Sequence, residues 1–189
     1  MSGHSKWSQI KRQKSVTDAA KSRVFSRYAR LIALESKSAG GGSASGGKDS
    51  PSLMAVIARA KAANMPKDNI ERAVAKGMSK DAGDLIPVVY EAYGPGGVAL
   101  MVHALTDNKN RTTQEIKHAL LLQGIELASP GAASWAFTKA GDTYMPNEPL
   151  MEVSGEDEKR LGVILEACDV HADVQQVFTN ARGYENIGD

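Results

Sequence analysis

Residues 86–106 carry the sequence IPVVYEAYGPGGVALMVHALT, which decides the fold of the second half of the chain. Two apolar runs, at residues 86–93 and 98–106, flank the segment Gly94-Pro95-Gly96-Gly97. Apolar runs of this length that are bounded by Gly and Pro are typical of strands, and the short Gly/Pro segment between them is typical of a turn. This stretch therefore predicts a β-hairpin.

Downstream of the hairpin, helical and extended patterns alternate. Helices are predicted at residues 112–122 and 156–168, because their apolar residues recur at helical spacing. Extended segments are predicted at residues 133–137, 143–145, 151–153 and 174–179. Strands and helices that interleave in one unit predict an α+β fold, here an α/β sandwich whose antiparallel or mixed sheet carries helices on one face. This domain is expected to span residues 85–180 and to be followed by a tail at 181–189.

Upstream of the hairpin the sequence predicts helices and no strand. They are expected at residues 17–37, 52–63 and 66–77, with Pro66 in the first turn of the third. Thr17 is placed to cap the first helix, Asn64 to end the second and Gly77 to stop the third. The resulting organisation is a basic arm at 1–16, a basic helical bundle at 17–78 with a flexible Gly/Ser linker at 38–50, and a second linker at 79–84.

The net charge of +1 conceals a strong segregation of charge along the chain. Residues 1–80 hold 16 Lys and Arg against 5 Asp and Glu, whereas residues 81–189 hold 7 against 17. The first half therefore carries +11 and the second half −10. Such asymmetry indicates a basic part that meets a polyanion, although a charge run also arises as a solvated basic face.

The basic residues concentrate in the arm and at the start of the first helix. Lysine and arginine neutralise phosphates, and a nearby tryptophan can stack on an unpaired base. The alternative role for Trp7 is to fasten the arm onto the helical bundle. The predicted nucleic-acid contacts are His4, Lys6, Trp7, Lys11, Arg12, Lys14, Lys21, Arg23 and Arg27, and a second contact is predicted at Asn108, Lys109 and Arg111.

Other patterns in the sequence argue against catalysis and against a bound cofactor. The segment 42–49 resembles a phosphate-binding loop, but Asp49 stands where a Ser or Thr should follow Lys48, and a helix precedes it. The 94–99 segment loosely fits a dinucleotide fingerprint but leads into a strand. Cys168 is the single cysteine, which fits a reducing compartment such as the cytoplasm. We expect no enzyme activity, cofactor, metal, small-molecule substrate or membrane-spanning segment.

Several blocks of the chain together resemble the YebC/PmpR family, which includes the mitochondrial translational activator of cytochrome oxidase subunit one. The resemblance covers nearly the whole chain and begins at Gly3, which implies that the arm belongs to the mature protein. The matching blocks are Gly3-His4-Ser5-Lys6-Trp7, Asp18 to Phe25, Asn64 to Ala73, Tyr90 to Gly97, Thr106 to Thr112, Gly131 to Phe137, and Asp173 to Val177.

The resemblance implies a helical first domain, α/β domains after it, and a non-enzymatic role in gene expression. Bacterial members are described as DNA-binding transcriptional regulators, and other members are implicated in translation at the ribosome. Members of the family usually carry a third domain inserted within the second. Here Thr138 to Asp142 leads almost directly to Tyr144, so the chain is expected to be a short form without that insert.

Three functions remain open from the sequence. The first, which the resemblance favours, is a DNA-binding transcriptional regulator whose basic helices grip phosphates. The second is an RNA-binding, ribosome-associated translational activator, because an extended arm with an aromatic residue suits irregular RNA. The third is a protein-interaction module that presents its acidic α+β domain to a protein partner without nucleic acid. We expect nucleic-acid-dependent regulation of gene expression.

Overall fold

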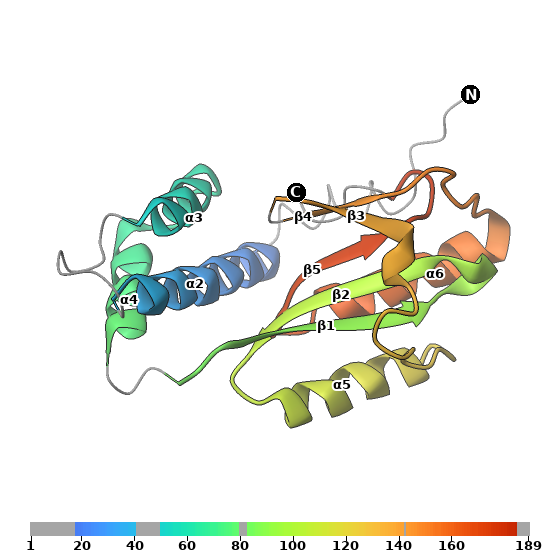
Figure 1. Cartoon of the computed structure of the whole chain (residues 1–189), viewed down its shortest axis with the longest axis horizontal. Helices are drawn as coiled ribbons and strands as arrows, with labels where there is room; N and C mark the ends of the chain where they lie inside the picture. The colour runs from blue at the N-terminus through green and yellow to red at the C-terminus, as the bar shows by residue number, and fades with distance from the viewer. Residues whose placement is uncertain (1–17, 41–49, 80–82, 142, 185–189) are drawn as a thin grey trace. The chain divides into compact units, whose positions relative to one another are not determined.

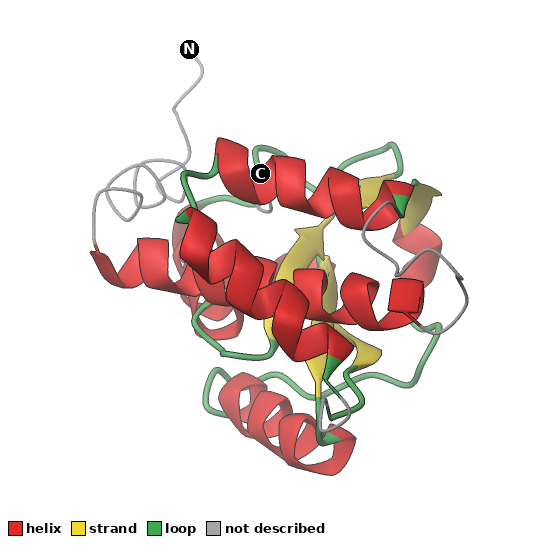
Figure 2. Cartoon of the chain, turned by 90° about the vertical axis from the view of Figure 1, so that its left-hand side faces the viewer, coloured by secondary structure: helices red, strands yellow, loops and turns green. Residues whose placement is uncertain are grey.

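The structure is a computed structural model that describes residues 18–40, 50–79, 83–141 and 143–184. The chain divides into two compact units: one spans Val16–Ile86, and the other contains Pro87–Asp189. The secondary structure of both is shown in Figures 1 and 2. Among the described residues, no helix has the length and apolar character needed to cross a membrane.

The first unit is built from three helices, α2 (Asp18–Gly40), α3 (Pro51–Ala62) and α4 (Lys67–Met78). α2 packs against both of the others (Figure 1). It runs three residues into the segment expected to be a linker, and Ser38 donates a hydrogen bond to the carbonyl of Leu34, at 3.1 Å. The core shared by the three helices consists of Ile32, Leu53, Val56, Ala60, Met65, Ile70 and Ala73.

The junction between α3 and α4 lies within a residue of its predicted position, with Pro66 as the N-cap and not in the first turn of α4. Asn64 ends α3 in the left-handed region, with φ of 61°, and Pro66 directly precedes α4. Gly77 was expected to stop α4, and this was wrong, because the helix continues to Met78. Gly77 is instead buried against α2, where an added Cβ would lie 2.2 Å from the carbonyl oxygen of Ala33. The glycine therefore permits the close approach of two helices.

The second unit contains a three-stranded sheet in the order β1-β2-β5, formed by β1 (Ile86–Tyr93), β2 (Ala99–Thr106) and β5 (Val174–Thr179). The tight turn η1 (Pro95–Gly97) joins β1 to β2, so the predicted hairpin is confirmed. β2 pairs antiparallel with β5, from Leu100 opposite Thr179 to Ala104 opposite Val174, with a bulge after His103.

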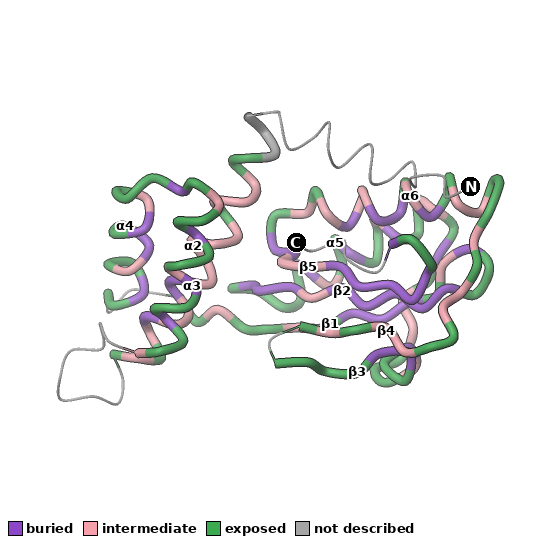
Figure 3. Tube along the Cα trace, turned by 90° about the horizontal axis from the view of Figure 1, so that it is seen from above, coloured by how far each residue is buried: buried purple, intermediate pink, exposed green. Residues whose placement is uncertain are grey.

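Successive residues of β2 face two different layers, and most of the strand is coloured as buried in Figure 3. Leu100, Val102 and Ala104 pack against α5 (Lys109–Leu121) and α6 (Gly155–Asp169), so the predicted α+β fold with helices on one face of the sheet is confirmed. Ala99 and Met101 face a second, two-stranded sheet formed by β3 (Phe137–Ala140) and β4 (Thr143–Pro146). Nearly every residue of β2 is therefore buried.

Three further predictions in this unit needed correction. The strand predicted at residues 133–137 starts only at Phe137, because η2 (Ser134–Ala136) precedes β3 and the amides of Ala133 and Ser134 donate to the carboxylate of Glu91. Residues 151–153 contribute a single bridge, between Met151 and Ala181. The predicted tail begins too early, because Ala181 and Tyr184 are part of the core. Residues 185–189 lie outside the described part.

The ring of His103 lies at the centre of an aromatic cluster beneath the β3–β4 sheet. Its centroid lies 4.9 Å from that of Tyr144 and 5.0 Å from that of Phe178, in edge-to-face contacts. Burial, followed by the charge of Lys139, lowers the pKa of His103 to about 4. The folded state therefore holds this histidine neutral.

We predict that Gly77→Ala destabilises the first unit by about 2 kcal/mol, since overpacking against Ala33 outweighs the gain in helix propensity of roughly 1 kcal/mol. Gly162→Ala in α6 is the matched control, because its Cβ meets nothing within 4 Å, and it should stabilise by about 0.5–1 kcal/mol. Urea unfolding followed by circular dichroism measures both. A Gly77→Ala variant as stable as the parent would contradict the close packing.

We predict that His103 makes the fold less stable in acid. The unfolded histidine binds a proton below its ordinary pKa of 6.5, whereas the folded one does so only near 4, so stability is lost as the pH falls between these values. His103→Phe removes this effect. The stability of the variant relative to the parent should rise on the order of 2 kcal/mol between about pH 7 and about pH 4.5. A His103→Phe variant whose stability depends on pH in the same way as that of the parent would contradict this account.

Candidate nucleic-acid interface

The predicted nucleic-acid contacts of the arm, at His4, Lys6, Trp7, Lys11, Arg12 and Lys14, lie outside the described residues. The other three contacts lie on α2. Lys21 is exposed, whereas Arg23 and Arg27 are partly buried along a helix whose Phe25 and Tyr28 pack against the helical core. The described contacts therefore share the first half of one helix.

The structure adds basic residues that the sequence analysis did not single out. The short helices α3 and α4 carry five basic and two acidic residues, and all five basic residues are exposed. One of them, Lys67, pairs with Glu71 one turn later at 3.5 Å, an arrangement of small energetic weight at the surface. These exposed residues are Arg59, Lys61, Lys67, Arg72 and Lys76. The first unit thus presents positive charge on all three of its helices.

The predicted second contact, at Asn108, Lys109 and Arg111, lies at the start of α5. The Asn108 side chain caps this helix, since its Oδ1 accepts the amide of Arg111 at 3.1 Å. The amide of Asn108 donates to Oγ1 of Thr106, at 2.9 Å. This cap explains why α5 begins at Lys109 and not at Thr112, as was predicted from apolar spacing alone.

Arg111 forms an ion pair with a buried carboxylate. Its Nη2 lies 2.8 Å from Oδ2 of Asp173, which is 1% exposed and also accepts the hydroxyl of Thr112 at 2.6 Å. Asp107 and Glu115 lie within 3.0 and 3.4 Å of the same guanidinium. Asp173, first of all, raises the pKa of Arg111. Arg111 therefore holds α5 against the start of β5, whereas the side chain of Lys109 is exposed.

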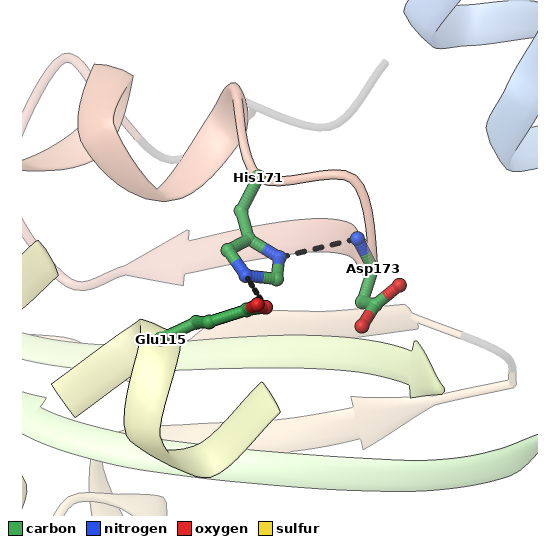
Figure 4. A group of neighbouring side chains, drawn as sticks. All are labelled: Glu115, His171 and Asp173. Atoms are coloured by element: carbon green, nitrogen blue, oxygen red, sulfur yellow. Dashed lines mark hydrogen bonds and ion pairs between the residues drawn. The ribbon is translucent and has the colours of Figure 1, made fainter. Parts of the chain in front are cut away.

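Glu115, His171 and Asp173 bring three side chains with metal-ligand chemistry together (Figure 4). Nδ1 of His171 accepts the amide of Asp173 at 3.1 Å, which leaves the proton on Nε2, 3.0 Å from the Glu115 carboxylate. The Asp173 carboxylate is engaged by Arg111 and Thr112. A cation would have to displace these hydrogen bonds, so the geometry favours a structural link between α5 and the loop after α6.

A buried carboxylate at Glu91 organises the loop that leads into η2. Glu91 is 8% exposed and accepts three backbone amides, those of Gly131 at 2.7 Å, Ala133 at 2.6 Å and Ser134 at 2.9 Å. Beside it, the indole N–H of Trp135 donates to the hydroxyl of Tyr93 at 2.9 Å. The sequence analysis assigned no role to these residues. A lone acid within an apolar strand was the one signal that could have revealed Glu91.

Comparison with known proteins places this arrangement in a family. Residues 5–80 match the TACO1/YebC protein N-terminal domain, and residues 85–148 match the TACO1/YebC second and third domain. A protein of Opitutus terrae is 44% identical over 98% of this chain and 69% of its own length. The chain belongs to the TACO1/YebC family. The recognition made from the sequence blocks is therefore confirmed.

Other TACO1/YebC relatives are named in the same way as the Opitutus protein. A protein of Thermosipho africanus is 44% identical over 80% of this chain, and both are called "Probable transcriptional regulatory protein". This chain spans only 59% of the length of the Thermosipho protein. The crystal structure of a conserved hypothetical protein from Aquifex aeolicus matches with a TM-score of 0.75 and 27% identity, over 87% of this chain and 91% of that one.

The sequence resemblance implied that other family members carry a domain inserted near residues 138–144, and here β3 and β4 are joined by a short connection. Phe137 pairs with Pro146 and Ala140 with Thr143, so two residues connect β3 to β4. The first of them, Gly141, has φ of 65°, a conformation that glycine adopts without strain. That this chain is a short form of the family remains a prediction from the resemblance.

We predict that Arg111 stabilises the fold in addition to any contact with nucleic acid. Arg111→Ala should lower the free energy of unfolding by about 2 kcal/mol, because it leaves the buried Asp173 carboxylate without its cation. Lys109→Ala, two residues earlier on the same helix and exposed, should change it by less than about 0.5 kcal/mol. Chemical denaturation of both variants tests this, and equal stabilities would show that the Arg111–Asp173 pair contributes nothing.

Proposed function

We propose that this chain is a nucleic-acid-binding regulator of gene expression and, more specifically, a DNA-binding regulator of transcription. The observation that carries the proposal is the segregation of charge, with +11 in residues 1–80 and −10 in the rest. The names of its relatives support the regulatory role. The proposal needs no catalytic group or cofactor, and it assigns the chain to the cytoplasm.

The mechanism that we propose relies on phosphate neutralisation by the basic half. Lys11, Arg12 and Lys14 of the arm would act with Lys21, Arg23 and Arg27 of α2, while His4, Lys6 and Trp7 add contacts at the end of the arm. Each phosphate that is neutralised releases condensed counterions, so binding should weaken steeply as salt rises. The acidic surfaces of the second unit would be repelled by the same polyanion and would be available to a protein partner.

A second candidate function is a translational activator that binds ribosomal RNA. Trp7 favours it, because an aromatic residue within a basic arm suits the unpaired bases of folded RNA better than a regular duplex. Sedimentation with ribosomes in the presence of excess duplex DNA separates the two candidates. Displacement by DNA supports the transcriptional role, whereas co-sedimentation that survives excess DNA supports the translational one. A chain that binds neither would point to a protein-interaction module.

We predict that the triple reversal Lys11→Glu, Arg12→Glu and Lys14→Glu weakens nucleic-acid binding at least about tenfold and flattens its dependence on salt. The variant Lys11→Arg, Arg12→Lys and Lys14→Arg keeps every charge and should bind like the parent. Fluorescence anisotropy of a labelled duplex over a range of salt concentrations measures both. Unchanged affinity in the reversed variant, with an unchanged unfolding midpoint, would remove the arm from the mechanism.

A further inference from the structure

The second unit holds a rigid aromatic pair at its surface, Tyr93 and Trp135, which we call the aromatic platform. Trp135 is 65% exposed and Tyr93 is 40% exposed. Large aromatic side chains usually bury most of their surface, so an indole left in water on a well-packed unit calls for a reason. Neither residue belongs to the basic half on which the proposed function rests.

The polar groups of the aromatic platform are already satisfied within the unit. The indole N–H of Trp135 donates to Oη of Tyr93 at 2.9 Å, and the Tyr93 hydroxyl donates to the carbonyl of Ala132. The Trp135 carbonyl accepts Nδ2 of Asn147 at 2.8 Å. A ligand would therefore meet the faces of the rings and would have no need to compete for their hydrogen bonds.

The Glu91 carboxylate fixes the backbone from which Trp135 projects. It lies in β1, two residues before Tyr93, and gathers the amides of Gly131, Ala133 and Ser134. Strand β1 therefore carries both Tyr93 and the buried acid that holds the loop before Trp135. Because this order exists before any ligand arrives, binding would not have to fix the two rings.

The segments around the aromatic platform lack the acidic character of the rest of the unit. Residues 92–106 and 127–138 contain no Asp, Glu, Lys or Arg. Glu91 is buried and committed to backbone amides. Asp157, which lies beside Gly96 in the adjoining turn, is 3.9 Å from Arg160. Exposed acids flank these segments at Glu126 and Glu148, so the uncharged area is limited to the two rings and the segments that carry them. A nucleobase stacked on the rings would meet no charged side chain of those segments.

We propose that the aromatic platform stacks an unpaired nucleobase. This contact would distinguish single-stranded from double-stranded nucleic acid and would not depend on phosphate charge. This inference rests on the nucleic-acid binding proposed above. Base stacking on aromatic rings tolerates any sequence and requires an exposed base face, which duplex DNA does not offer. The ligand class is single-stranded nucleic acid, either RNA or locally melted DNA.

The chain has two tryptophans, so Trp7→Phe leaves Trp135 as the only indole fluorophore. In this variant, oligouridine and oligodeoxythymidine should quench tryptophan fluorescence on binding, while a blunt DNA duplex should bind without quenching. The comparison of the two oligonucleotides tells RNA from DNA as the preferred strand. Anisotropy of dye-labelled forms of the same probes reports binding independently of stacking.

In the otherwise native chain, Trp135→Ala should weaken oligouridine binding roughly tenfold and leave duplex binding unchanged. Trp135→Phe, which keeps a ring, should retain most of the affinity, and circular dichroism checks that both variants fold. Binding without quenching, together with unchanged oligonucleotide affinity in Trp135→Ala, would overturn the platform and favour a protein-docking role for it. No anisotropy change with any probe would instead overturn the proposed nucleic-acid function.

Discussion

Burial of β2 on both of its faces is the constraint on which the second unit depends. Leu100, Val102 and Ala104 require a cover of helices, and Ala99 and Met101 require a second cover on the opposite face. The unit therefore needs α5 and α6 on one face and the β3–β4 sheet on the other. The same layers bury two carboxylates, those of Asp173 and Glu91. Each of them accepts several hydrogen bonds, as a buried charge requires.

The two units differ in charge and in packing. The helical unit has a small core and an exposed surface rich in lysine and arginine, which suits a ligand that is recognised by charge. The α+β unit is acidic and more extensively packed, and it presents fixed groups, among them the indole of Trp135. The first unit would then supply affinity for nucleic acid, and the second would discriminate single strands from duplexes. The two properties could be altered separately.

The sequence predicted the hairpin and β5 to within a residue, because apolar runs bounded by Gly and Pro report strands directly. It failed where a distant side chain determines the local backbone. Hydrogen bonds to Glu91 hold residues 133–134 in a turn and not in a strand. The sequence between residues 130 and 137 does not indicate a partner about 40 positions earlier. Gly77 was misread because a glycine that ends a helix and one that lets two helices touch look alike in sequence. All of the predicted nucleic-acid contacts remain predictions, and the six in the arm lie outside the described residues.

The two-residue connection between Ala140 and Thr143 is a site at which residues could be inserted into the chain. The core of the unit is closed by elements on either side of the connection, so material added there would lengthen a surface turn without disturbing the packing around β2. Lengthening such a loop costs little free energy, since the entropy of closing it grows only with the logarithm of its length. The hairpin could therefore accept an insertion as large as a domain while the α+β scaffold around β2 stays the same.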